Sequence, residues 1–349
     1  MKPLLKYPGG KERELQYVIE RLPDKIDNYY EPFFGGGAIF FGLDTACCKH
    51  TFLNDKSDDL VLFYNNVAHS HALFFYFLDD YIYNWEYLSA IVDNNYNEFK
   101  NNTKKIKALI NPLYSDRVIN AVDDKIKRMR ELEKKKGKLP PEDIKDNIEC
   151  AIKQGYYYFI REVYNSKIRN NIFDEERAAA FYFMREYCYS SMFRFNSSGE
   201  FNVPYGGISY NRKTLNDKVQ KLKDNETIKK FSNAVVKCLD FEEFLNKYPP
   251  HKNDFMFLDP PYDSEFSEYD KNSFNKDDQH RLAEYLINKC ECPWLLIIKA
   301  SPLILKLYKH GTPTQTGRCL FVEGFDKKYS VSFKNRNLKD CEHLIIKNY

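Results

Sequence analysis

Short apolar runs rich in β-branched and aromatic residues alternate along the chain with longer amphipathic stretches. This alternation is the pattern of a parallel sheet whose strands are joined by crossover helices. The runs predicted as strands are Asn28 to Glu31, Thr51 to Asn54, Ala234 to Leu239, Asp254 to Leu258 and Trp294 to Lys299. Two later runs, Arg318 to Val322 and Glu342 to Lys347, are predicted to close the sheet as a hairpin. The pattern therefore predicts the α/β class.

A long stretch with a helical pattern separates the second predicted strand from the third, which predicts an inserted domain. It holds a polar helical stretch from about Trp85 to Glu149, a tyrosine-rich helix near Tyr156 and a third helix through Ala178 to Tyr187. From Phe195 to Val203, apolar and aromatic residues flank an Asn, Ser and Gly turn, which predicts a β-hairpin. The expected domains are residues 1–84 and 231–349 for the sheet and residues 85–230 for the insert.

The length of 349 residues is sufficient for a large core with a second domain. The net charge of +3 does not by itself indicate a nucleic-acid binder, because the placement of the charge decides. Between Lys100 and Lys138, however, the sequence has thirteen Lys or Arg residues and only five Asp or Glu residues. This segment, which includes Lys134 and Lys135, predicts either a solvated helical surface or a contact with DNA phosphates.

The nine cysteines show neither a paired CxxC spacing nor histidines at the spacing of a zinc site. They indicate a reduced, cytoplasmic protein without a metal. The sequence also lacks the parts of a signal peptide and any apolar run of about 18 residues, so we expect no membrane segment.

In an open parallel sheet, ligands bind beyond the carboxyl ends of the strands, so the segments that follow the predicted strands carry the candidate chemistry. Glu31 to Gly37 reads Glu-Pro-Phe-Phe-Gly-Gly-Gly, and its glycines let a ligand approach the backbone where a helix begins. The segment has neither the GxGxxG spacing of a dinucleotide site nor the Gly-Lys-Ser/Thr of a P-loop.

Two further strand ends carry an acid. Asp55 follows the second strand, roughly 20 residues past the glycines, where a carboxylate can accept hydrogen bonds from both ribose hydroxyls of a nucleoside. Asp240 and Phe241 follow the third strand and suit the edge and the ring of an adenine. Both places also fit a purely structural interpretation, in which the acid caps a helix and the aromatic residue belongs to the core.

Asp259-Pro260-Pro261-Tyr262 follows the fourth strand and is the most specific signal in the chain. Two prolines fix the backbone and hold an acid and an aromatic ring in set positions. At the amino terminus, Lys6 to Lys11 reads Lys-Tyr-Pro-Gly-Gly-Lys and combines an aromatic ring, a tight turn and a cation.

Taken together, these segments resemble the Dam-type, D12-class DNA adenine methyltransferases, and the order of the motifs resembles the α arrangement. The resemblance implies a Rossmann-like methyltransferase sheet and an insert that recognises DNA. For the cofactor S-adenosylmethionine it implies Tyr7, Gly10, Lys11, Glu31, Phe33, Gly35, Gly37, Asp55, Asp240, Phe241 and Asp259. For catalysis it implies Asp259, Pro260 and Tyr262, and for the DNA-recognition hairpin Arg194, Asn196, Asn202 and Tyr205.

The activity implied is methyl transfer to the N6 amine of a flipped adenine in double-stranded DNA by direct in-line displacement. Phe266 is a further candidate to hold the base. A cognate restriction endonuclease is a possible partner, a monomer is favoured, and GATC is a hypothesis for the target. The chain departs from the family at Ser190-Ser191, where Asn-Gly is frequent. The alternatives are methylation of cytosine N4, RNA or a protein amide, a Rossmann oxidoreductase, and an inactive DNA-binding homologue.

Overall fold

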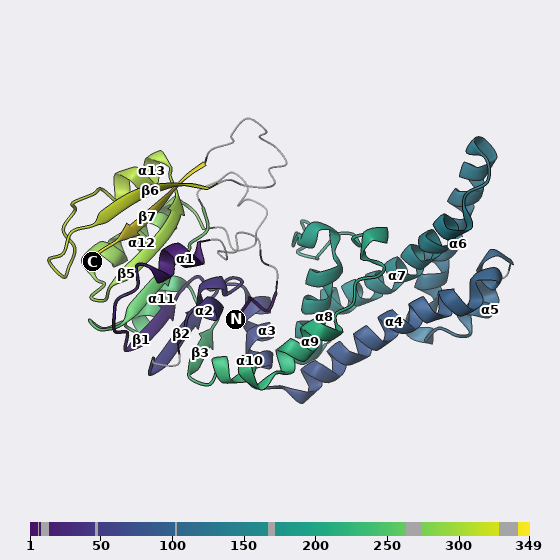
Figure 1. Ribbon diagram of the computed structural model, residues 1–349, viewed down its shortest axis with the longest axis horizontal. Coiled ribbons are helices and arrows are strands. Elements are labelled where there is room, and N and C mark those ends of the chain that lie inside the picture. The colour runs from purple at the N-terminus through teal and green to yellow at the C-terminus, as the bar shows by residue number, and fades with distance from the viewer. Residues whose placement is uncertain are drawn as a thin grey trace. The chain divides into compact units, whose positions relative to one another are not determined.

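The computed structural model describes residues 1–5, 7, 14–45, 48–101, 103–166, 172–262, 274–327 and 341–349. The chain divides into two compact units (Figure 1). The sheet unit consists of residues 1–64 and 226–349, and the helical unit consists of residues 65–225. The boundaries expected from the sequence lay at 84/85 and 230/231. Helix α4 (Ala72–Asn101) crosses residue 84 and belongs to the helical unit as a whole, because it packs against α7 (Pro141–Asn165) and α8 (Asp174–Tyr187).

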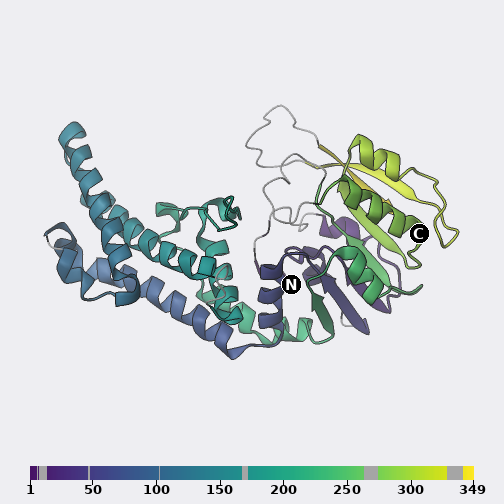
Figure 2. The ribbon, with the colours of Figure 1, turned by 180° about the vertical axis from the view of Figure 1, so that it is seen from behind.

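The sheet has seven strands in the order β3-β2-β1-β4-β5-β7-β6 (Figures 1 and 2). The strands are β1 (Asn28–Glu31), β2 (His50–Asn54), β3 (Ala234–Lys237), β4 (Phe255–Leu258), β5 (Trp294–Lys299), β6 (Phe321–Lys327) and β7 (Cys341–Lys347). β3, β2, β1, β4 and β5 run parallel, whereas β7 pairs antiparallel with both β5 and β6. The predicted parallel sheet with a closing hairpin is therefore confirmed.

The last hairpin begins later than its sequence pattern suggested. The strand expected at Arg318 to Val322 is β6, which starts at Phe321, and Cys319 forms only an isolated bridge with Pro313. β6 lies at the edge of the sheet and pairs with β7 alone. The apolar run of the sequence therefore did not mark the full extent of this edge strand.

The central strands of the sheet are buried. All four residues of β4 and the first five of β5 are buried, as expected for strands with neighbours on both sides. Their side chains form a core with helices α11 (Phe241–Lys247) and α12 (Lys276–Asn288). The other helices of the sheet unit are α1 (Leu15–Ile19), α2 (Ala38–Gly42), α3 (Asp58–Ala68, which crosses residue 64), α10 (Asn225–Lys230) and α13 (Pro302–Leu307).

The helical unit is built on α4, α7 and α8 and on a long pair of neighbouring helices, α6 (Pro112–Lys136) and α7 (Figures 1 and 2). Gly155 lets these two helices approach closely, since a Cβ atom there would lie 2.6 Å from Cα of Val118. Rings of Trp85, Tyr156, Phe183 and Tyr187 fill the core of the unit. The other helices among the described residues of this unit are α5 (Thr103–Lys107), α9 (Asn216–Lys223) and two 3-10 turns, η2 (Tyr189–Ser191) and η3 (Ile208–Tyr210).

The segment expected as a β-hairpin, Phe195 to Val203, is a compact turn closed by one isolated bridge. Phe195 pairs with Phe201, and the backbone N–H of Asn196 donates to the carbonyl of Glu200 at 2.8 Å. Asn165 at the end of α7 both donates to and accepts from the backbone of Phe201. The turn is therefore fixed by a helix side chain rather than by a long strand ladder.

Candidate functional site

The carboxyl ends of β3, β2, β1 and β4 lie along one edge of the sheet, because these neighbouring strands are parallel. Asn54, at the end of β2, joins the loops on both sides of it. Its side-chain amide donates to the carbonyls of Pro32 at 3.1 Å and Leu239 at 3.0 Å, and its side-chain oxygen accepts from the N–H of Leu239 at 3.0 Å. Asn54 is buried, so its amide fixes the relative positions of three strand ends.

Asp55 is attached to the glycine-rich loop. Its Oδ2 accepts a hydrogen bond of 2.7 Å from the N–H of Gly35, and its Oδ1 accepts one of 2.8 Å from the N–H of Ser57. Gly37 has a φ of 68°, and a Cβ atom there would lie 2.7 Å from the ring of Phe34. The loop conformation therefore requires glycine at residue 37 and places the acid beside the loop backbone.

Tyr7 packs against the same loop. A Cβ atom at Gly36 would lie 2.8 Å from Cβ of Tyr7, and one at Gly35 would lie 3.3 Å from its ring. The absence of side chains at these glycines is therefore what admits the tyrosine. The other residues of the amino-terminal motif that were assigned to the cofactor, Gly10 and Lys11, lie outside the described residues.

Glu31 is a buried acid at the end of β1, with an exposed fraction of 2%. Its Oε2 accepts a hydrogen bond of 2.9 Å from the hydroxyl of Tyr29. Burial raises the pKa of the Glu31 carboxyl well above its ordinary value, and the nearby charge of Asp259 raises it further. Two of the residues assigned to the site from the sequence, Glu31 and Asp259, are therefore electrostatically linked.

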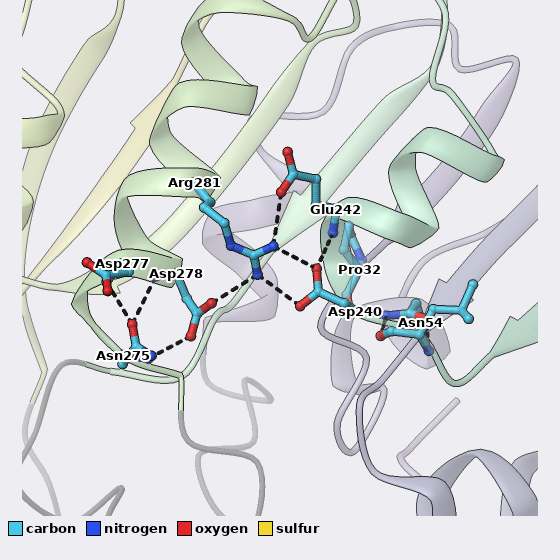
Figure 3. A network of polar contacts seen from close by, with 9 residues as sticks. Pro32, Asn54, Asp240, Glu242, Asn275, Asp277, Asp278 and Arg281 are labelled. Carbon is cyan, nitrogen blue, oxygen red and sulfur yellow. Dashed lines mark hydrogen bonds and ion pairs between the residues drawn. The ribbon is translucent and has the colours of Figure 1, made fainter.

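Asp240 lies in a network of charged groups (Figure 3). It caps α11 by accepting from the N–H of Glu242 at 3.0 Å, and Arg281 donates to both of its oxygens, at 3.2 and 2.9 Å. Arg281 also donates to the carboxylates of Glu242 and Asp278. Partial burial acts to raise the pKa of Asp240, but the hydrogen bonds from Arg281 and Glu242 hold it below its ordinary value.

Phe241 does not offer the open ring face that the sequence suggested. It is 3% exposed, the guanidinium carbon of Arg281 lies 4.8 Å from its ring centroid, and the rings of Phe33 and Phe274 lie 5.7 and 5.8 Å away. Phe33 and Phe274 are half-buried. The aromatic surface that a ligand can meet here comes from these two rings, with Phe241 beneath them.

The Asp259 to Tyr262 loop follows β4 directly, and Pro260 in it is buried. The side-chain amide of Gln279, which is 0% exposed, donates to the carbonyl of Pro261 at 3.0 Å. The ring of Tyr262 lies 5.5 Å from the ring of the buried His343 in an edge-to-face arrangement. The loop is therefore held by α12 on one side and by β7 on the other. Phe266 lies outside the described residues.

Gln279 and Arg281 are the contributors that sequence reasoning missed, and both belong to α12. A capping box of Asn275 and Asp278 starts this helix beside the strand ends. In the first turns of this helix, Gln279 contacts the loop after β4, and Arg281 contacts Asp240 in the loop after β3. No sequence signal marks these residues, because a polar residue in an amphipathic helix is ordinarily solvated.

The residues proposed to read DNA lie in the helical unit. Arg194 is exposed, and its Nε donates to the side-chain oxygen of Asn202 at 3.3 Å, which orients the guanidinium. The side chain of Asn196 is used within the turn, where its oxygen accepts from the N–H of Glu200 at 2.8 Å. Tyr205 does not face a surface, contrary to the prediction that it contacts DNA. It is 6% exposed and its hydroxyl donates to the side-chain oxygen of Asn211, so it supports the segment from the core.

Lys134 and Lys135 lie exposed on the last turn of α6, followed by Lys136. No ion pair within the described ranges involves any of the three. Cations at a helix C-terminus interact favourably with the helix dipole, which is a structural reason for their place. Their exposure also leaves the charges available to an external anion.

No group of three or more His, Cys, Asp or Glu side chains among the described residues could hold a metal ion. In the same part of the chain, every helix is too short or too polar to cross a bilayer.

Comparison with known proteins gives a consistent result. The family model "D12 class N6 adenine-specific DNA methyltransferase" matches residues 7–136 and 140–316. The chain is 30% identical to Type II methyltransferase M.MjaIII of Methanocaldococcus jannaschii, over 82% of this chain and 79% of that protein. It is 25% identical to Type II methyltransferase M.CviBI of Paramecium bursaria Chlorella virus NC1A over 100% of both chains. It is 23% identical to the DNA adenine methylase of Haemophilus influenzae, over 81% of this chain and 73% of that protein.

Proposed function

We propose that this chain, which belongs to the D12 class of N6 adenine-specific DNA methyltransferases, takes its methyl group from S-adenosylmethionine and acts on a flipped adenine within a specific DNA site. The family expected from the motifs is confirmed, and the chain is accordingly an adenine-specific DNA methyltransferase.

The residues at the strand ends fit the donor. Tyr7 packs against the glycine loop, Asp55 lies against its backbone, and Asp240 keeps a partly exposed, ionised carboxylate. Two carboxylates suit the ribose hydroxyls and the adenine amine, and the half-buried rings of Phe33 and Phe274 suit the faces of the base. Bound S-adenosylmethionine would supply an electrophilic methyl carbon on a sulfonium.

The loop after β4 would orient the acceptor. The lone pair of an adenine N6 amine is delocalised into the ring, so the amine is a poor nucleophile until its two hydrogens are held. The carboxylate of Asp259 and the carbonyl of Pro260 can accept these hydrogens and aim the lone pair at the methyl carbon. Tyr262 would stack on the flipped base, and the hydrogen bond from Gln279 to Pro261 keeps the backbone before that ring in place.

The helical unit would bind the DNA. Arg194 is exposed and oriented by Asn202, so its two outer nitrogens can face the O6 and N7 acceptors of a guanine. Lys134 and Lys135 would contact phosphates, which position the protein without choosing a base. In this assignment Asn196 and Tyr205 shape the turn, whereas Asn202 directs the arginine.

The relatives M.MjaIII and M.CviBI both carry the name Type II methyltransferase. We extend from this that a cognate endonuclease for the same DNA site is a partner. We propose separately that the enzyme works as a monomer and acts in the cytoplasm.

One observation carries the proposal: the Asp259 to Tyr262 loop follows β4, and β4 lies next to β1, whose glycine loop is hydrogen-bonded to Asp55. The test is transfer of a labelled methyl group from S-adenosylmethionine to unmethylated duplex DNA, followed by nucleoside analysis. We expect the label in N6-methyladenine. Label in N4-methylcytosine, in RNA offered in parallel, or in no product would refute the proposal.

A further inference from the structure

We propose that Arg281 is a positioning residue that makes the cofactor site select a purine with an exocyclic amino group over one with an exocyclic oxygen. The inference rests on the proposed function, because it assumes that Asp240 faces the adenine of the cofactor. Arg281 itself would not contact the cofactor and would act through Asp240.

The hydrogen bonds of Asp240 leave one acceptor position open. A carboxylate has two lone pairs on each oxygen. Oδ1 accepts from the N–H of Glu242 at 3.0 Å and from Arg281 at 3.2 Å, so both of its lone pairs are used. Oδ2 accepts from the other outer nitrogen of Arg281 at 2.9 Å. Within the described residues, three donors therefore fill three positions, and the fourth lies on Oδ2 of a carboxylate that is 30% exposed.

The fork of Arg281 also fixes the plane of this carboxylate. Its two outer nitrogens contact the two oxygens of Asp240 separately, and they are held in turn by Glu242 at 3.0 Å and Asp278 at 2.9 Å (Figure 3). The guanidinium also lies over the ring of Phe241, with its carbon 4.8 Å from the ring centroid, a contact that favours this orientation. Because the arginine is held at three carboxylates and one ring, the open lone pair of Asp240 has a single direction.

The charge state of Asp240 makes this direction selective. Arg281 stabilises the ionised form, which can accept a hydrogen bond but has no proton to donate. An exocyclic amine therefore finds its partner, whereas an exocyclic oxygen meets a second acceptor. Two acceptors that face each other without a proton between them disfavour binding, and this discriminates between the two ligands.

A purely structural role for Arg281 is the competing explanation, since the same contacts join α11 to α12. Lys289 provides a matched control for that explanation. Its Nζ lies 3.7 Å from Glu242, in the same network, and forms no ion pair with Asp240 in the described part of the chain.

The experiment measures the affinities for S-adenosylhomocysteine and for its 6-oxo counterpart, S-inosylhomocysteine, by calorimetry on the full chain. The quantity of interest is the ratio of the two dissociation constants. We expect the wild type to favour the amino compound by about a hundredfold, and Arg281→Met to reduce this preference by about tenfold or more. Lys289→Met should keep the wild-type preference within about twofold. A loss of stability alone would lower both affinities together and leave the ratio unchanged.

Arg281→Lys is a second variant for the case that Arg281→Met does not fold, because lysine keeps a cation among the three carboxylates. A single ammonium cannot reproduce the planar fork, so its preference should also fall. A wild-type preference retained in either Arg281 variant, or absent from the wild type, would overturn the inference. A wild type that binds neither compound would instead remove the assignment of S-adenosylmethionine, on which the inference rests.

Discussion

The backbone N–H of Gly35 donates a hydrogen bond of 2.7 Å to Oδ2 of Asp55, so the acid after β2 holds the loop after β1. This contact joins two motifs that lie 20 residues apart in the sequence. It also means that Asp55 has two tasks in the proposed site: it anchors the glycine loop and faces the ribose.

The first prediction separates these tasks. Asp55→Ala should weaken the binding of S-adenosylhomocysteine by about tenfold or more, because the loop anchor and the acceptor for ribose are both lost. Asp55→Asn keeps a side-chain oxygen for the N–H of Gly35 but loses the charge, so the affinity of this variant should lie between those of the wild type and Asp55→Ala. Calorimetry measures both. An unchanged affinity in Asp55→Ala would remove this residue from the cofactor site.

The second prediction concerns the place where the chain departs from its family. Ser190 and Ser191 have φ values of 53° and 52°, in the left-handed region that Asn and Gly adopt readily. The backbone conformation that Asn-Gly favours is thus retained with two serines. Ser191→Gly should raise the free energy of unfolding by about 0.5–1 kcal/mol, the relieved strain being offset in part by the greater freedom of glycine in the unfolded chain.

The measurement is urea denaturation followed by far-ultraviolet circular dichroism. Ser209→Gly is the control, because Ser209 lies in η3 and is not among the described residues with a positive φ. This change should lower stability. Equal effects of the two substitutions would show that no strain is stored at Ser191.

The extent to which these features could be predicted from the sequence depended on how local their causes are. The buried run Phe255 to Leu258 identified β4 because each residue packs into the core. The burial of Phe241, by contrast, depends on Phe33 and Phe274, which are far away in the sequence, and Tyr205 is buried by a core that no local pattern describes. The role of Arg281 depends on a helix–helix contact that charge patterning does not reveal.

The third prediction tests the end of α6. Replacing Lys134, Lys135 and Lys136 with Ala should flatten the dependence of log affinity on log salt concentration, by about 0.9 for each lysine that contacts a phosphate of duplex DNA. The effect should be equal for specific and nonspecific DNA. Lys105 and Lys107 serve as the control pair, since each already forms an ion pair, with Glu98 and Asp116 respectively. An unchanged slope in the triple variant would mean that this turn is only a solvated surface.

The fourth prediction concerns the reading of the DNA sequence. Arg194→Ala should lose preference at one guanine position in a library of sites that differ by single bases, with about 1–3 kcal/mol of discrimination lost. Arg194→Lys keeps the charge but not the fork, so it should retain affinity and lose the same preference. The measurement compares the methylation rates of the wild type and the two variants at every site of the library. An equal fall at every site would show that Arg194 holds a phosphate and that the specificity lies elsewhere.

The central claim is that the carboxylate of Asp259 orients the adenine amine, and single-turnover methyl transfer by Asp259→Ala tests it most directly. The rate should fall by at least about a hundredfold, since an oriented acceptor in the transition state is lost. The affinity for S-adenosylhomocysteine should stay within an order of magnitude of the wild type. Glu243→Ala, which removes an exposed acid from the same unit, should leave both values unchanged. Transfer by Asp259→Ala at the wild-type rate would contradict the mechanism.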